Sequence, residues 1–233
     1  MKRLLLAVMI ALLLSLGAAW AGPHEDATAA YQRGDYASAL RILRPLAAQG
    51  DAFAQYNLGV MYSSGQGVAQ NYTEAIKWFR LAAAQGVANA QYSLGVMYAH
   101  GEGVTRDDAE AVKWFRRAAT QGDPDAQSLL GAAYGSGRGI TQDFAEAVKW
   151  LRLAAAQGNA VAQTLLGDAY FTGLGATQDY VRAHMWFNLA GASGDTNGVK
   201  YRDAVAAKMT PQQIAEAQKM ARECQQRKFK GCD

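Results

Sequence analysis

Cysteine, histidine and proline are scarce in this chain. The only two cysteines among 233 residues, Cys224 and Cys232, both lie near its end. The rest of the chain therefore cannot be held by the dense disulfide framework that is typical of small secreted domains. The three histidines are widely separated in sequence, so that two cysteines and these histidines do not form a set of metal ligands. We expect no metal site and no cofactor.

A strong excess of one charge is also lacking. The chain has 23 Lys and Arg against 20 Asp and Glu, a net charge of +3. Lys2 and Arg3 account for two of these positive charges, so the net charge of the remainder is 21 − 20, or +1. No basic patch indicates binding to nucleic acid or to an acidic membrane surface.

Long apolar runs are absent except at the N-terminus. Residues 4–16 are almost wholly apolar, follow Lys2 and Arg3, and precede Ala19-Trp20-Ala21. This layout is typical of a secretory signal peptide, 1–21, with cleavage after Ala21. The alternative, a permanent anchor helix, is disfavoured because the run is shorter than the ~20 residues that span a bilayer. We expect a periplasmic or secreted mature chain, 22–233, with no stable membrane anchor after cleavage.

Signatures of catalysis are missing as well. The chain has no Ser-x-x-Lys, no His-Glu-x-x-His, no phosphate-binding Gly-Lys pair and no nucleophile elbow. Glycine-rich segments such as Gly65-Gln66-Gly67 recur at a fixed spacing, which favours turn geometry over a phosphate loop. We expect no catalytic residues and no enzymatic activity.

A repeat of 36 residues dominates what is present. Glycines, glutamines, tyrosines and tryptophans recur in register, and so does a Leu-Gly pair. The glycines are Gly50, Gly86, Gly122, Gly158 and Gly194; the tryptophans are Trp78, Trp114, Trp150 and Trp186. A fixed period of this length indicates a solenoid of stacked units. A solenoid is usually a binding surface rather than an enclosed site for chemistry.

Each unit is predicted to be a helical hairpin. In residues 50–85, Leu58 and Tyr62 share one face of a first helix, and Gly65 and Gly67 mark a loop. Asn71, with Glu74 three residues later, predicts a capping box at the start of a second helix. The tryptophans lie on the apolar stripe of that second helix, so we interpret them as core residues and not as ligand contacts.

The period divides the mature chain into six parts. A capping half-repeat is expected at 22–49. Four units follow, at 50–85, 86–121, 122–157 and 158–193, and capping helices with a tail occupy 194–233. Thr210, Pro211 and Gln213 predict the start of a last helix that runs to about Arg227.

The two cysteines allow two states. Eight residues along one straight helix would separate them by about 12 Å, which is too far for a bond. They can pair if the helix ends near Arg227 and the tail folds back, and we favour this disulfide over two free thiols because an exported chain meets an oxidising compartment.

The unit resembles the Sel1-like repeat, a relative of the tetratricopeptide repeat. The resemblance rests on the pattern A-x-A-Q-x-x-L-G-x-x-Y followed by E-A-x-K-W-F, which residues 86–121 fit nearly throughout. It implies an all-α fold, an α-solenoid in which hairpins stack into a right-handed superhelix with concave and convex faces. It also implies adaptor roles in signalling or envelope assembly.

A partner-binding face is expected on the concave side, which the first helices line in this architecture. The expected residues are those that vary between units: Phe53, Tyr56, Val60, Asn89, Tyr92, Val96, Asp125, Ser128, Val161, Thr164 and Asp168. An exposed apolar row among them would mark a binding site. The alternative is that the superhelix curls tightly and these residues contact one another.

The function we expect is that of a non-catalytic scaffold of the bacterial cell envelope that holds a partner protein, with weak self-association as a further possibility. The alternative is a cell-wall-associated protein that binds peptidoglycan fragments or has β-lactamase-like activity. This alternative hypothesis is weaker, because the related cysteine-rich proteins carry a cysteine pair in each repeat and this chain has no cysteine in its repeats.

Overall fold

A computed structural model describes residues 22–232. Within this range the chain forms twelve helices and no strands. The helices are α2 (Pro23–Gln32), α3 (Tyr36–Ala48), α4 (Ala52–Ser64), α5 (Tyr72–Ala84), α6 (Ala88–His100), α7 (Asp108–Thr120), α8 (Pro124–Ser136), α9 (Phe144–Ala155), α10 (Ala160–Thr172), α11 (Tyr180–Ala192), α12 (Thr196–Ala206) and α13 (Pro211–Gln226). The prediction of an all-α solenoid is confirmed. The expected signal peptide lies outside the described residues.

Short polar and glycine signals set the ends of each hairpin. In the first unit, the Asp51 carboxylate accepts a hydrogen bond from the Ala54 backbone N–H and begins α4. Gly65 ends α4 at a φ of 73°, in the left-handed region that glycine adopts without a steric penalty. Asn71 then caps α5 by accepting a bond from the Glu74 backbone N–H. The same signals recur 36 residues on, so the same hairpin forms again.

The capping boxes predicted at the second helices form only in part. Asn71 makes its bond, but the Glu74 carboxylate pairs with Lys77 at 2.5 Å instead of returning to the cap. The corresponding glutamates in α7 and α9 pair with Lys113 and Lys149 at 2.7 Å. An ion pair with a residue three positions along the helix has thus replaced the second bond of the box.

The two helices of a hairpin meet at a glycine and a large side chain. A Cβ atom on Gly95 would lie 2.5 Å from the ring of Phe115, so only glycine allows this approach. Gly59 faces Phe79, and Gly167 faces Phe187, in the same way. The recurring Leu-Gly pair is therefore a packing feature: leucine fills the core while glycine admits the aromatic ring of the second helix.

Side-chain hydrogen bonds connect each hairpin to the next. The buried Gln91 amide donates to the Ala83 carbonyl of the preceding unit, and Gln121, at the end of the same unit as Gln91, donates to the Gln91 amide oxygen at 2.8 Å. A second link runs from Arg116 to the Tyr134 hydroxyl, also at 2.8 Å. Because these bonds recur at several junctions, they fix the register in which the units stack.

The tryptophans occupy a different place from the one expected. Of the four repeat tryptophans, Trp186 is fully buried, whereas Trp78, Trp114 and Trp150 are half-buried. Each of these three packs against a cluster built from the preceding unit and from the first helix of its own hairpin. They therefore lie at the junctions between units, and the buried residue beside each is the next one in sequence, such as Phe79 or Phe115.

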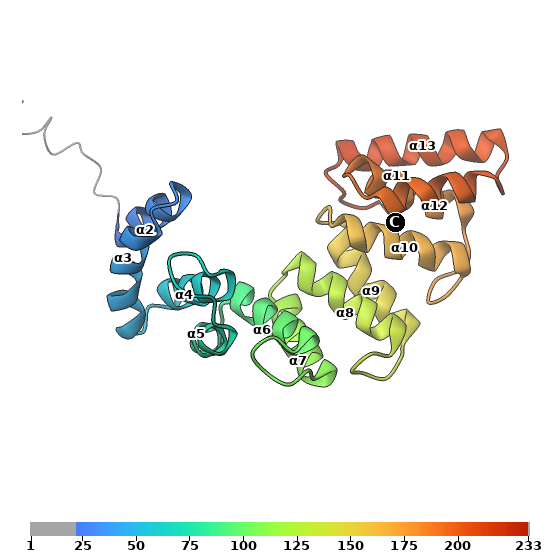
Figure 1. Cartoon of the computed structure of the whole chain (residues 1–233). Coiled ribbons are helices and arrows are strands. Elements are labelled where there is room, and N and C mark those ends of the chain that lie inside the picture. The colour runs from blue at the N-terminus through green and yellow to red at the C-terminus, as the bar shows by residue number, and fades with distance from the viewer. Residues whose placement is uncertain (1–21, 233) are drawn as a thin grey trace, which may run out of the picture.

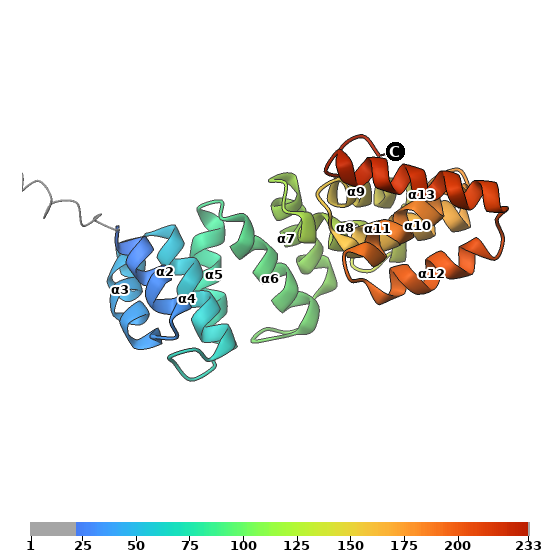
Figure 2. The ribbon, with the colours of Figure 1, turned by 90° about the horizontal axis from the view of Figure 1, so that it is seen from above.

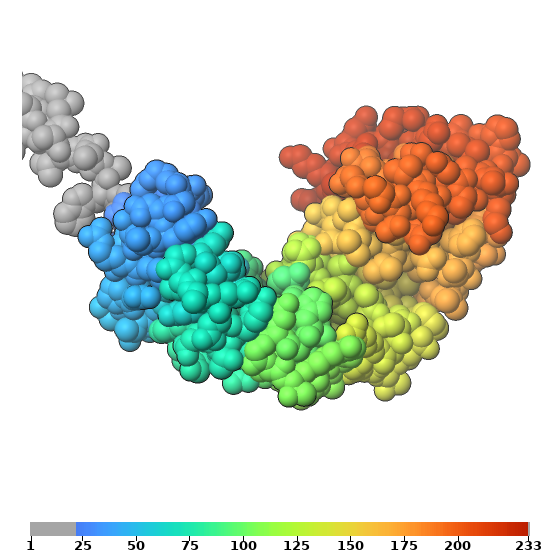
Figure 3. All heavy atoms as spheres, viewed as in Figure 1, coloured from blue at the N-terminus to red at the C-terminus, as the bar shows by residue number. Residues whose placement is uncertain are grey.

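The stacked hairpins form an open arch (Figures 1 and 3). The N-terminal helices α2 and α3 and the C-terminal helices α11 to α13 rise on either side of a hollow. Helices α4 and α6 lie toward the inside of the arch, and α5 and α7 toward the outside (Figure 1). The expected concave face therefore exists.

The C-terminal end departs from the repeat. Helix α12 packs on α11 as a further first helix would, but α13 also packs on α11 (Figure 2). Met185 and Leu189 of α11 are buried, although the matching residues Lys77 and Leu81 of α5 are exposed. Helix α13 covers this face of α11, and the stack of hairpins ends there.

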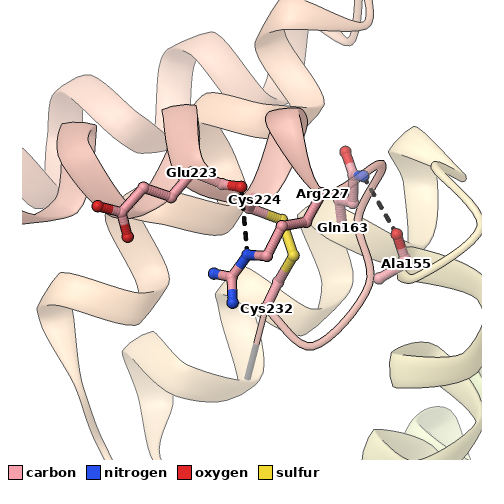
Figure 4. The surroundings of a disulfide bond; sticks show 6 residues. All are labelled: Ala155, Gln163, Glu223, Cys224, Arg227 and Cys232. Carbon is pink, nitrogen blue, oxygen red and sulfur yellow. Dashed lines mark hydrogen bonds between the residues drawn. A yellow bond between two sulfur atoms is a disulfide. The ribbon is translucent and has the colours of Figure 1, made fainter.

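The tail after α13 folds back on itself. Thr210 and Gln213 form the capping box that begins α13, and the helix ends at Gln226. A disulfide joins Cys224 to Cys232, whose Cα atoms lie 5.3 Å apart (Figure 4). Both cysteines belong to the hydrophobic cluster at the C-terminal end of the stack. Phe229 lies in the loop that the disulfide closes, and its ring lies against Gly158.

Candidate functional site

The first groove of the concave side lies between α6 and α8. It has a volume of about 350 Å³. Tyr92 and Val96 line it from α6, Leu129 and Ala132 from α8, and the buried Phe115 of α7 lies beneath. Most of the lining is apolar, which suits the aliphatic or aromatic side chain of a ligand.

The second groove lies one unit further along, between α8 and α10. Its volume is about 390 Å³. Ala132 and Gly135 line it from α8, Leu165 and Asp168 from α10, and the buried Leu151 of α9 lies beneath. Nearly every lining residue stands 36 positions after one that lines the first groove, so the two grooves are repeats of one another.

Helix α8 forms the wall that the two grooves share. Ala132 and Ser136 line both of them. The residue at the position of Ala132 is valine in the two preceding units, Val60 and Val96. Because α8 presents small side chains here, the ridge between the grooves is low, and one ligand can reach into both.

An ion-pair cluster closes one end of the first groove. Asp108 lies 2.8 Å from the Arg106 guanidinium and 2.8 Å from that of Arg138, which comes from the loop after α8. Hydrogen bonds from Arg138 and Arg106 hold the pKa of Asp108 well below its ordinary value. At this end of the groove, two guanidinium groups thus share the carboxylate of Asp108.

Tyr56 and Tyr92 are half-buried on the inner side, and they pack on the second helices of their own hairpins. The Tyr92 ring centroid lies 6.2 Å from that of Phe115, and the Tyr56 centroid lies 5.9 Å from that of Phe79. Burial raises the pKa of both phenols above the ordinary value. Both tyrosines therefore stay neutral and serve as rigid aromatic surface.

The structure places the other expected binding residues unevenly. Val96 and Asp168 line the grooves, and Val60 is half-buried on α4. Phe53 is partly exposed at the N-terminal end, where its ring lies 4.6 Å from that of His24. Asn89 and Asp125 are exposed, and Asp125 accepts a hydrogen bond from Asn159 at 2.7 Å. Val161 is 57% exposed and lines neither groove.

Two expected surface residues are buried, which corrects the sequence-based assignment. Ser128 is 3% exposed and Thr164 is 8% exposed. They occupy the position of Tyr56 and Tyr92, but their side chains are too short to emerge between the helices. Thr164 instead donates to the Asp195 carboxylate at 2.7 Å and thereby links α10 to the start of α12.

Several groove residues escaped the sequence analysis. Leu129 and Leu165 directly follow the expected residues Ser128 and Thr164 in sequence. Ala132 was not predicted because a short side chain gives no signal for binding. Comparing the four units column by column would have found Ala132 as the smallest residue of its set. The salt-bridged Asp108 and Arg138 lie 30 positions apart, off the repeat period, so no periodic pattern predicts them.

The described residues provide neither a metal site nor a helix that could span a membrane. Among residues 22–232, no three His, Cys, Asp or Glu side chains are grouped so that they could hold a metal ion. No helix in this part of the chain has the length and hydropathy needed to span a membrane.

Fold and grooves together define an α-solenoid of helical hairpins with a concave binding surface. Four consecutive stretches match the model of the Sel1 repeat: 52–87, 88–123, 124–159 and 160–195. The chain belongs to the Sel1 repeat family. The matched stretches begin two residues later than the units into which we divide the chain. Sel1 repeats in general mediate protein–protein interaction.

Two solved structures illustrate the relationship. The chain is 33% identical to c5321, a protective antigen present in uropathogenic Escherichia coli strains and displaying an SLR fold; the match covers 95% of this chain and 49% of that one, with a TM-score of 0.81. It is 29% identical to a Sel1 repeat protein from Oxalobacter formigenes over 83% of both chains, with a TM-score of 0.71. The chain thus spans about half the length of the antigen. No curated protein matches the sequence.

Proposed function

We propose that this protein is a non-catalytic scaffold of the bacterial cell envelope that holds a segment of a partner protein on its concave side. The observation that carries the proposal is the pair of repeat-related apolar grooves that meet at α8. A single extended or helical segment can place side chains in both, because the residues of α8 between them are small.

The proposed location follows from the first 21 residues and the two cysteines. A signal peptide cleaved after Ala21 would deliver the chain to the periplasm or the exterior, where the bond between Cys224 and Cys232 can form and persist. Mass spectrometry of the protein isolated from its native cells tests this. We expect an N-terminus at Gly22 and an intact disulfide; an uncleaved chain with free thiols would contradict the proposed location.

Affinity capture from the native envelope tests the binding role. The wild-type protein is compared with Ala132→Gln, which places a long neutral side chain between the two grooves. Leu81→Gln is the matched control, since Leu81 is 49% exposed on α5 and lines neither groove. Both variants must keep the helical circular dichroism of the wild type.

We expect one or more proteins to be retained by the wild type and by the Leu81 variant and lost from the Ala132 variant. Equal retention by all three would place the binding surface elsewhere. The purified protein is expected not to hydrolyse nitrocefin, and measurable turnover would contradict a non-catalytic role.

A further inference from the structure

Asp168 breaks the apolar pattern of the concave wall. The residues at this position of the first helices are Val60, Val96, Ala132 and Asp168, each 36 positions after the one before. Ala132 lines the first groove at the place where Asp168 lines the second. One of the two grooves therefore contains a carboxylate where the repeat otherwise presents a small apolar side chain.

The Asp168 carboxylate has no hydrogen-bond or ion-pair partner among the described residues. Most other acidic side chains of the repeats are engaged: Asp123, Asp143 and Asp179 cap helices, and Asp108 holds two arginines. The groove around Asp168 is lined by apolar side chains such as Phe144, Leu165 and Leu174. Burial by these neighbours raises the pKa of Asp168 above its ordinary value.

Three cationic side chains at this end of the molecule contact groups other than Asp168. Arg182 pairs with Asp179 at 3.1 Å, and Arg202 pairs with Asp203 at 2.8 Å. The Lys208 ammonium lies 5.4 Å from the centre of the Phe171 ring. The structure thus leaves a solvent-exposed carboxylate without a salt-bridge partner in a groove whose other lining residues are mostly apolar, where a cationic group of a ligand would supply the missing partner.

The opposite end of the paired grooves differs, because its carboxylate is already neutralised. Arg106 and Arg138 share the carboxylate of Asp108 there. A cation of a ligand finds no unpaired carboxylate lining that groove, whereas aliphatic side chains fit between Val96 and Leu129. The charges therefore set the direction in which a ligand lies across α8.

We propose that the partner segment presents a lysine or arginine to Asp168 in the second groove and aliphatic side chains to the first groove. This inference rests on the proposed function and specifies the chemistry of its partner. A segment with an acidic side chain in place of the cation is rejected, because it would place two carboxylates together in the second groove.

Selection of peptides from a random library displayed on phage tests the inference. The bait is the purified, oxidised protein in four forms: wild type, Asp168→Asn, Ala132→Gln and Glu216→Gln. Glu216→Gln removes the same charge as Asp168→Asn, but from the exposed surface of α13, outside both grooves. Affinities of the selected peptides are then measured for each form, together with those of peptides in which the cation is replaced by glutamine.

We expect the wild type and Glu216→Gln to select peptides with one lysine or arginine beside aliphatic residues. These peptides should lose about tenfold in affinity for Asp168→Asn, and a similar amount when their cation becomes glutamine. Binding that depends on Ala132 but shows no preference for a cation would overturn this inference and leave the proposed function standing. The same selection by Ala132→Gln as by wild type, or no selection by the wild type, would overturn both.

Discussion

At the scale of single residues, the recurring hydrogen bond between two glutamines is missing at Gln163. In each of the three preceding units the glutamine at the end of the second helix donates to the residue that corresponds to Gln163, as Gln157 does to Gln127 at 2.9 Å. The residue that would donate to Gln163 is Ser193, which is too short. The amide oxygen of Gln163 is left buried without a partner, although its nitrogen donates to the Ala155 carbonyl (Figure 4).

Ser193→Gln is expected to supply the missing hydrogen-bond donor to Gln163. A new hydrogen bond to a buried, unpaired oxygen should raise the free energy of unfolding by about 1 kcal/mol, as measured by urea denaturation. Ser193→Met, which has a similar length and no donor, is the control and should give no gain. Equal gains from both variants would show that packing, and not the amide bond, is responsible.

His184 is the second residue at which the last unit departs from the pattern. Its equivalents Ile76, Val112 and Val148 are buried and apolar, and His184 is buried too, with its Nδ1 atom unpartnered. Burial, reinforced by the positive charge of Arg202 and opposed by the negative charge of Asp203, lowers the pKa of His184 below its ordinary value of 6.5. Folding therefore favours the neutral imidazole.

The stability of the protein should consequently fall as the pH drops below about 6.5, because the unfolded chain then binds a proton that the folded chain does not. His184→Val is expected to remove this contribution, so that urea unfolding curves above and below that pH differ less than in the wild type. His100→Gln, a change at an exposed histidine, should leave the dependence in place. An unchanged pH dependence in His184→Val would contradict the assignment.

At the scale of the helices, the fold was largely predictable because its signals are local. Asp, Asn and Thr at helix starts and glycine at helix ends fix the boundaries within each unit, and repetition gives the same signals again. The tryptophan environment was not predictable from one helix, since the stripe that contains Trp114 faces both its own hairpin and the preceding one. Only the stacking of the units decides which side chain is central.

Phe115→Ala should therefore be more harmful than Trp114→Ala. Phe115 is 6% exposed beneath the first groove, and its truncation is expected to cost about 3–5 kcal/mol. Trp114 is half-buried, with the Arg117 guanidinium 4.5 Å above its ring, so its truncation should cost less. Leu153→Ala, at a side chain that is 51% exposed, is the control and should change little.

Thermal and urea unfolding of these three variants, made one at a time, give the comparison. A larger loss for Trp114→Ala than for Phe115→Ala would contradict the placement of the two rings.

At the scale of the whole molecule, the repeat predicted a concave face but not where the grooves on it lie. The expected residues Tyr92, Val96 and Asp168 do line the grooves, because residues on the inner face of each first helix recur with the period. Ser128 and Thr164 do not, because exposure also depends on side-chain length relative to the neighbours. The start of the last helix at Thr210 was predicted, but its packing on α11 was not, since nothing in the order of the helices requires α13 to return to α11.

The central claim is that a partner protein occupies the grooves beside α8. Site-specific photo-crosslinking in the native cells tests it most directly, with a benzoylphenylalanine residue replacing Leu129 in the first groove or, as a control, Leu81 on the outer helix α5. The account predicts a discrete protein adduct from position 129, absent from position 81 and lost when Ala132→Gln is added. The absence of an adduct from position 129, or the same adduct from both positions, would contradict it.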